Sequence, residues 1–133
     1  MRRDLNPFRG LTSLVLALGC SSTQAVEVIC HADLALTADE VKELFLGDKQ
    51  LAGGVKLIPV DNAALQVDFS ARLLQLEVAR YAARWTRKAF RDGLTAPAVK
   101  GSDAEVLAYV RSTVGAVGYV NGPSTGVKVL LKY

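Results

Sequence analysis

Short runs rich in β-branched residues alternate along this chain with amphipathic segments that carry helix-capping residues, and this order restricts the fold more than any other feature. Runs of the first kind are typical of strands, and apolar residues three or four positions apart are typical of helices. Strands separated by helices indicate an α/β layer structure, with right-handed crossovers where neighbouring strands run parallel. We predict strands at VEVICH (26–31), VKLIPV (55–60), GAVGYV (115–120) and GVKVLLKY (126–133).

Two helix starts are marked by capping-box patterns. Thr37 is followed three residues later by Glu40, and Ser102 is followed in the same way by Glu105. In such a pair the hydroxyl and the carboxylate satisfy reciprocal backbone N–H groups. Gly47 is suited to end the first of these helices, because glycine accepts the left-handed conformation that commonly follows a helix.

The segment 63–90 contains no glycine or proline, and Val78, Tyr81, Trp85 and Phe90 recur in it at roughly helical spacing. This predicts one long helix, or two helices with a break near 75–77. The polar side is strongly basic, and we interpret it as a solvated helix face rather than a site for an acidic partner or a membrane surface. Its cationic residues are Arg72, Arg80, Arg84, Arg87, Lys88 and Arg91.

The N-terminus has the pattern of an export signal. Three arginines precede the apolar run 11–19, which is roughly half as long as a bilayer-spanning helix. Cleavage after Ala25 would leave 26–133 as one domain, and residues 1–25 are predicted to be a signal peptide. The alternative is a lipoprotein signal, in which Cys20 carries the lipid and anchors the protein to a membrane. Both interpretations predict a periplasmic location.

The charge and the reactive residues exclude several classes of function. The leader holds three of the 16 basic residues and one of the 13 acidic ones, so the net charge falls from +3 to +1 without it, which argues against a nucleic-acid partner. We predict no metal site, because His31 is the one histidine and no cysteine cluster accompanies it. No catalytic motif is present, so we predict no enzyme activity and no cofactor. Cys30 is interpreted as a small buried apolar residue.

The strand that contains Pro59 is predicted to lie at a sheet edge or to end there. The reason is that proline has no backbone N–H and cannot donate a ladder hydrogen bond.

Several motifs in order resemble the phosphate-binding substrate-binding proteins of ABC transporters, and in particular their short, single-lobe members. The matching stretches are FLG (45–47), PV (59–60), Trp85, Phe90 and GAVGYV (115–120), and they span nearly the whole chain after the leader. The resemblance implies a single lobe of the periplasmic-binding-protein type, with a mixed sheet of about four to five strands flanked by helices. It also implies that Gly115 turns the chain out of a helix and that Gly118 allows a close backbone approach in a strand.

The same resemblance leads to two hypotheses about function. In the first, the exported lobe binds phosphate or a similar oxyanion in connection with ABC-type transport. The donors are then backbone N–H groups at the start of the helix after IPV, where the dipole favours an anion; the candidate binding residues are Thr37, Asn62, Ala63, Ala64, Leu65 and Ser102.

The second hypothesis is a ligand-free accessory protein of the cell envelope that keeps the lobe. It rests on the sequence after IPV, which reads DNAALQVDF (61–69) and contains none of the serine, glycine and threonine residues of the family's loop. In this hypothesis an envelope protein binds the basic helix face.

Overall fold

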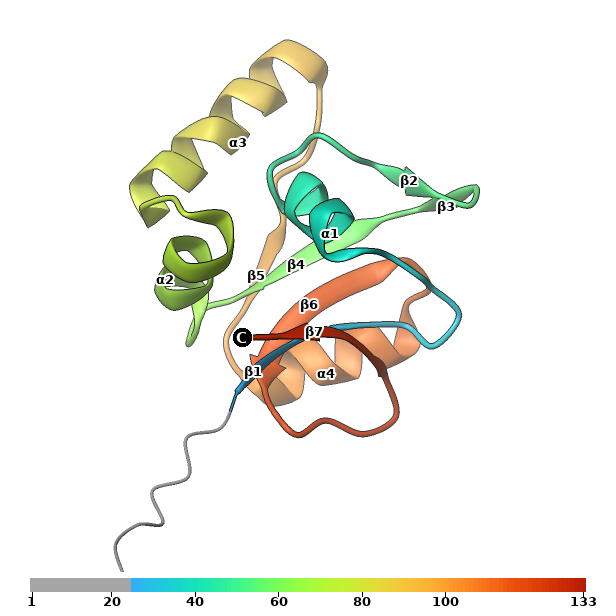
Figure 1. Cartoon of the computed structure of the whole chain (residues 1–133). Helices are drawn as coiled ribbons and strands as arrows, with labels where there is room; N and C mark the ends of the chain where they lie inside the picture. The colour runs from blue at the N-terminus through green and yellow to red at the C-terminus, as the bar shows by residue number, and fades with distance from the viewer. Residues whose placement is uncertain (1–24) are drawn as a thin grey trace, which may run out of the picture.

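The computed structural model describes residues 25–133, which form one α/β lobe (Figure 1). Residues 1–24 of the expected leader, with its cationic and apolar runs and Cys20, lie outside the described residues. The strands are β1 (Val26–Cys30), β2 (Leu51–Ala52), β3 (Val55–Lys56), β4 (Ile58–Asn62), β5 (Ala98–Lys100), β6 (Ala116–Asn121) and β7 (Lys128–Lys132). The helices are α1 (Ala38–Phe45), α2 (Gln66–Phe69), α3 (Val78–Asp92) and α4 (Asp103–Ser112), and a π-helical turn, η2 (Ser70–Leu74), follows α2.

Five of the strands form one mixed sheet in the order β5-β4-β6-β1-β7. β4 is parallel to both β5 and β6, whereas β1 is antiparallel to β6 and β7. The predicted α/β lobe with a mixed sheet is therefore confirmed. β2 and β3 form a separate two-stranded hairpin, so the strand predicted over 55–60 is in fact two strands.

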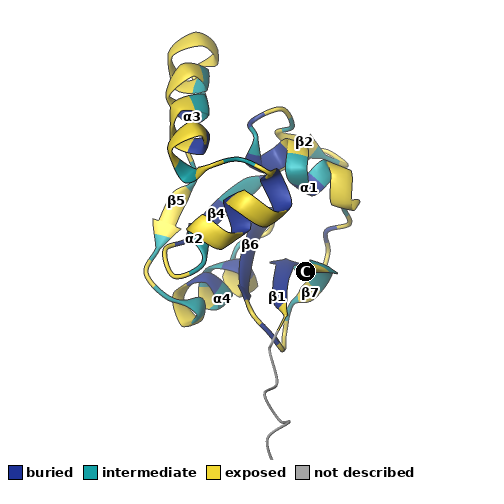
Figure 2. Ribbon diagram, turned by 60° about the vertical axis from the view of Figure 1, so that its left-hand side comes forward, coloured by how far each residue is buried: buried dark blue, intermediate teal, exposed yellow. Residues whose placement is uncertain are grey.

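Helices cover both faces of the sheet (Figure 1). The buried apolar side chains form two cores. Successive side chains of a strand point to opposite faces, and in β6 Tyr119 belongs to the larger core, while Val120 belongs to the smaller. The larger core contains residues of α1, η2 and α3, and the smaller contains Val106 and Val110 of α4. Figure 2 shows that α3 projects beyond the sheet with most of its surface exposed. Within the described residues no helix is both long enough and apolar enough to cross a membrane.

The prediction that the strand with Pro59 lies at a sheet edge or ends there is wrong, because β4 lies between β5 and β6 and continues to Asn62. Pro59 is tolerated for a local reason. The Ile58 N–H donates toward β6, to Gly115 O at 2.8 Å, so the next residue along the strand faces the β5 side. The pairing with β5 begins only at Val60. A backbone N–H at position 59 would therefore find no paired residue of β5 to accept from it, so proline removes no ladder hydrogen bond here.

The break predicted near 75–77 is confirmed. Gln75 adopts the left-handed conformation (φ 58°), and α3 begins three residues later. The buried hydroxyl of Ser70 donates to Leu76 O at 2.8 Å and holds the turn.

Both glycines of GAVGYV have the roles that the resemblance implied. Gly115 has φ +93°, and a Cβ there would lie 2.2 Å from Lys56 O. Gly118 faces α4, and a Cβ would lie 2.6 Å from the Cγ1 of Val106. The backbone of β6 thus packs directly against α4. Cys30 is buried, as predicted, and it forms no disulfide within residues 25–133.

Candidate functional site

The carboxyl ends of β4, β5 and β6 meet at one edge of the sheet, because the three strands run parallel. Two helices start there: α2 after β4, and α4 after β5. The loops that lead into them are in contact, since the Ala63 N–H donates to Lys100 O at 2.9 Å. In open α/β sheets this edge is the usual place for a ligand.

Asn62 ties the two loops together from a fully buried position. Its amide nitrogen donates to Asp103 Oδ1 at 2.6 Å and to Tyr119 O at 3.0 Å. Its amide oxygen accepts from the Ala64 N–H at 3.1 Å. Asn62 therefore fixes the loop before α2 to the first residue of α4.

The candidate donors just after β4 all have partners inside the protein. The N–H of Ala63 bonds to Lys100 O, that of Ala64 to Asn62 Oδ1, and that of Leu65 to Asn62 O at 3.0 Å. The first N–H groups of a helix have no acceptor within the helix. At the start of α2 the N–H groups that have no acceptor among the described residues are therefore those of residues 66–68. Anion binding by the loop residues remains a prediction.

At the start of α4, side chains occupy the local donors. The Ser102 hydroxyl accepts from the Glu105 N–H at 3.3 Å, but the Glu105 carboxylate bonds to the Gly101 N–H instead of to Ser102. The Asp103 carboxylate accepts from Asn62 on one oxygen and, at 3.4 Å, from the Asn121 N–H on the other. The Asp103 carboxylate thus places a negative charge between the two loops.

Thr37 caps α1 as predicted, with a complete capping box. Within the described residues its hydroxyl and its backbone N–H both bond to Glu40, and neither bonds to Asn62 or Ser102. The structure brings Asn62 and the start of α4 together through Asp103 and does not link Thr37 to them.

Asp61 is buried on the opposite face of β4 from Asn62, where two tyrosines bind its carboxylate. The Tyr81 hydroxyl donates to Oδ2 at 2.9 Å, and the Tyr119 hydroxyl donates to Oδ1 at 2.8 Å. Burial raises the pKa of Asp61 above the ordinary 3.8, while the bonds from Tyr119 and Tyr81 lower it in part. Burial and the nearby Asp61 also raise the pKa of each tyrosine. No cation pairs with Asp61 among residues 25–133.

A hollow of about 440 Å³ lies beside this cluster, between α3 and the segment that carries β5. Its walls are mostly apolar, and its polar lining residues are Asp61, Gln66 and Thr86. Sequence reasoning missed the cluster, because its members are 20 and 58 residues apart and no local spacing relates them.

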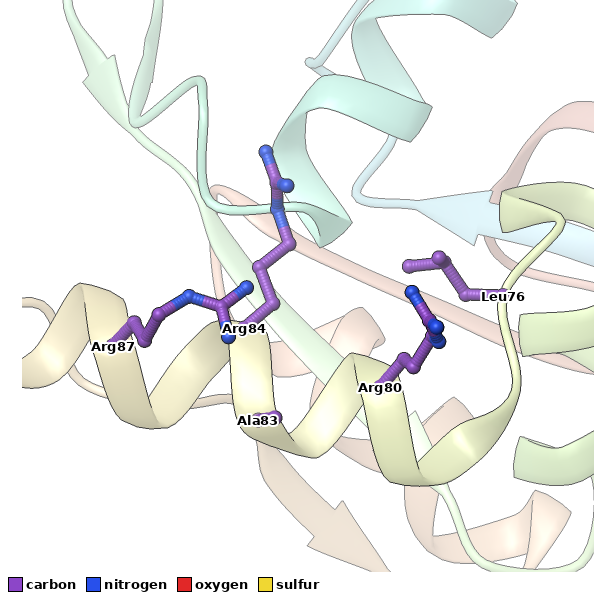
Figure 3. Close-up of a pocket in the computed structure, with 5 residues that line it drawn as sticks. All are labelled: Leu76, Arg80, Ala83, Arg84 and Arg87. Carbon is purple, nitrogen blue, oxygen red and sulfur yellow. The ribbon is translucent and has the colours of Figure 1, made fainter.

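A second, basic hollow of about 340 Å³ lies along α3 (Figure 3). Leu76, Arg80, Ala83, Arg84 and Arg87 line it. Arg84 is held in place, since its Nε donates to Leu46 O at 2.7 Å and its guanidinium pairs with Asp48 at 2.9 Å. Arg80 and Arg87 form no ion pair within the described part of the chain.

Comparison with known proteins relates this chain to solved structures. No protein-family model and no curated protein sequence matches it. An ABC-type phosphate transport receptor from Vibrio cholerae is similar with a TM-score of 0.50 and 17% identity, over 80% of this chain and 45% of the receptor. A putative phosphate ABC transporter substrate-binding protein with bound phosphate, from Clostridium perfringens, is similar with a TM-score of 0.57 and 12% identity, over 80% of this chain and 44% of that protein. This chain thus shares its fold with part of each of these two proteins, and it spans less than half the length of either.

Proposed function

We propose that this chain is an exported, single-lobe protein of the substrate-binding type that recognises a small oxyanion, phosphate first among them, in connection with ABC-type transport. The observation that carries the proposal is the likeness in fold to a phosphate-bound protein over most of this chain. The parallel strand ends and two adjoining helix starts support it, because such an edge offers N–H groups to an anion.

The proposed binding residues are at the edge formed by β4, β5 and β6. The N–H groups of residues 66–68 at the start of α2 would be the principal donors, and the Ser102 hydroxyl at the start of α4 would be a second one. The role is binding without catalysis. The chain spans under half of each neighbour, so the proposal concerns this lobe alone.

The proposed location is the periplasm. Residues 1–25 would direct export, and 26–133 would be the mature domain, released by cleavage after Ala25 or anchored through a lipid on Cys20. Mass spectrometry of the protein isolated from the envelope distinguishes the two, because cleavage and lipidation leave different N-terminal residues.

Calorimetric titration with phosphate, sulfate and molybdate tests the binding. The Asp103 carboxylate opposes an anion at this edge, so Asp103→Asn is expected to bind phosphate about tenfold more tightly than the unmodified protein. Asp33→Asn is the matched control, because it removes one carboxylate at an exposed position (81% exposed side chain). The absence of heat at millimolar ligand in all three proteins would contradict the proposal and leave the ligand-free accessory protein as the account.

A further inference from the structure

The outward face of α3 combines cationic residues with one exposed aromatic ring. Tyr81 and Trp85 are only 2% and 6% exposed and mark the side of α3 that packs on the lobe. The residues on the opposite side are three or four positions apart, so that they share one helix face, and all are exposed. They are Arg80, Ala83, Arg87, Phe90 and Arg91.

Phe90 is 91% exposed, although its spacing in the sequence groups it with Tyr81 and Trp85. The offset of five residues from Trp85 rotates it off the buried side, since residues three or four apart share a face. Its ring lines a shallow, mostly apolar hollow of about 410 Å³ with Thr86, Arg87 and Arg91. A single exposed apolar side chain is ordinary, but this one lies among guanidinium groups.

The positive charge of this face is largely uncompensated. Asp48 holds Arg84 and Lys88 against the loop after α1, which removes them from the outward face. Arg91 has one weak contact, at 3.8 Å, with Asp92. Arg80 and Arg87 have no ion pair in the described ranges and point along the basic hollow (Figure 3).

We infer that this face of α3 rests on an anionic lipid bilayer, with Arg80, Arg87 and Arg91 at headgroup phosphates and the ring of Phe90 at the acyl boundary. Charge complementarity favours an anionic bilayer at this face, because one guanidinium group can donate two parallel hydrogen bonds to the oxygens of a phosphate. Clustered arginine residues on a helix are attracted to anionic headgroups, and an exposed aromatic ring among them can enter the boundary between headgroups and acyl chains. An acidic envelope protein at this face is the competing outcome.

Co-sedimentation of the exported protein with phosphatidylcholine vesicles, with and without phosphatidylglycerol, tests the inference. Binding is expected only with the anionic lipid and is expected to fall in high salt. Each arginine near such a surface contributes roughly a fivefold gain, so Arg80→Glu/Arg87→Glu should lower binding at least 20-fold. Lys56→Glu/Lys128→Glu makes the same change in net charge at exposed residues outside α3 and should lower it far less.

The position of Phe90 needs a separate measurement. The protein has one tryptophan, Trp85, and it is buried. In Phe90→Trp the added emission should be quenched by brominated lipid, while the emission of the unmodified protein should stay unchanged and report an intact fold.

Equal binding to both vesicle types, no effect of the arginine reversals, or no quenching in Phe90→Trp would overturn the inference. Capture of an acidic protein that depends on Arg80 and Arg87, without vesicle binding, would do so as well. The test is independent of the oxyanion proposal, because the arginine variants leave the edge at β4, β5 and β6 unchanged and should bind phosphate like the unmodified protein.

Discussion

Gly118 is a position where the fold leaves no room for a side chain. The Cβ of an alanine would lie 2.6 Å from the Cγ1 of Val106, which is fully buried. Gly118→Ala should therefore reduce the free energy of unfolding by about 1–3 kcal/mol, measured by urea denaturation. Gly101→Ala is the control, because its nearest contact would be an ordinary 3.6 Å.

The cause of that loss can be checked with a second substitution. If the clash with Val106 is responsible, Val106→Ala should relieve it, and the double variant should be more stable than the sum of the two single effects by about 1 kcal/mol. Strictly additive losses would show that Gly118 is required for another reason.

Asp61 should make the protein less stable as the pH rises. Its pKa is raised in the folded state, so the folded protein holds the proton more tightly than the unfolded chain does. The stability that this proton contributes is fully present below the ordinary pKa of 3.8 and is lost as the pH rises from there through the folded pKa. Asp61→Asn removes this titration, so the stability of the variant relative to the unmodified protein should increase with pH. Urea denaturation across the acidic range measures it, with Asp33→Asn as the control, and a relative stability that decreases with pH would contradict the account.

The roles of these two residues differ in how far they could be predicted. The need for Gly118 follows from its place in a strand-like motif, since glycine in a strand marks a close approach. The burial of Asp61 does not, because Tyr81 and Tyr119 reach it from elements distant in the sequence. A charged residue after a strand normally indicates a solvated loop, and tertiary packing overrides that expectation here.

The junction between α2 and α3 depends on one strained residue. Gln75 has φ 58°, a conformation that costs a residue with a Cβ about 1 kcal/mol. Gln75→Gly should therefore stabilise the protein by about 0.5 kcal/mol once the extra freedom of glycine in the unfolded chain is subtracted. Gln75→Ala keeps the Cβ and should give no gain. Thermal unfolding compares the three proteins, and a less stable Gln75→Gly would contradict this explanation.

Helices were easier to predict than strands in this chain. The starts of α1 and α4 follow from Thr37 and Ser102, because a cap is a local interaction over three residues. β5 has only three residues and no β-branched alternation, so nothing local marks it. The interior place of β4 was missed because strand order depends on pairing between distant segments, and Pro59 is accommodated only because β5 is short.

The molecule as a whole is one lobe with a potential ligand edge at one end of the sheet and a basic helix that projects from it (Figure 2). The fold class could be predicted from the order of elements. The hydrogen bond that joins the two loops at the ligand edge could not be predicted, because Asn62 and Asp103 are 41 residues apart in the sequence. We propose that the sheet edge binds an oxyanion and that α3 binds a lipid surface.

An amide-resolved NMR titration with phosphate tests most directly whether this lobe binds an oxyanion where three parallel strands end. Binding at this edge predicts the largest, saturating shifts in residues 66–68 and at Ser102 and its neighbours. Shifts confined to the arginines of α3, or none at millimolar phosphate, would contradict it.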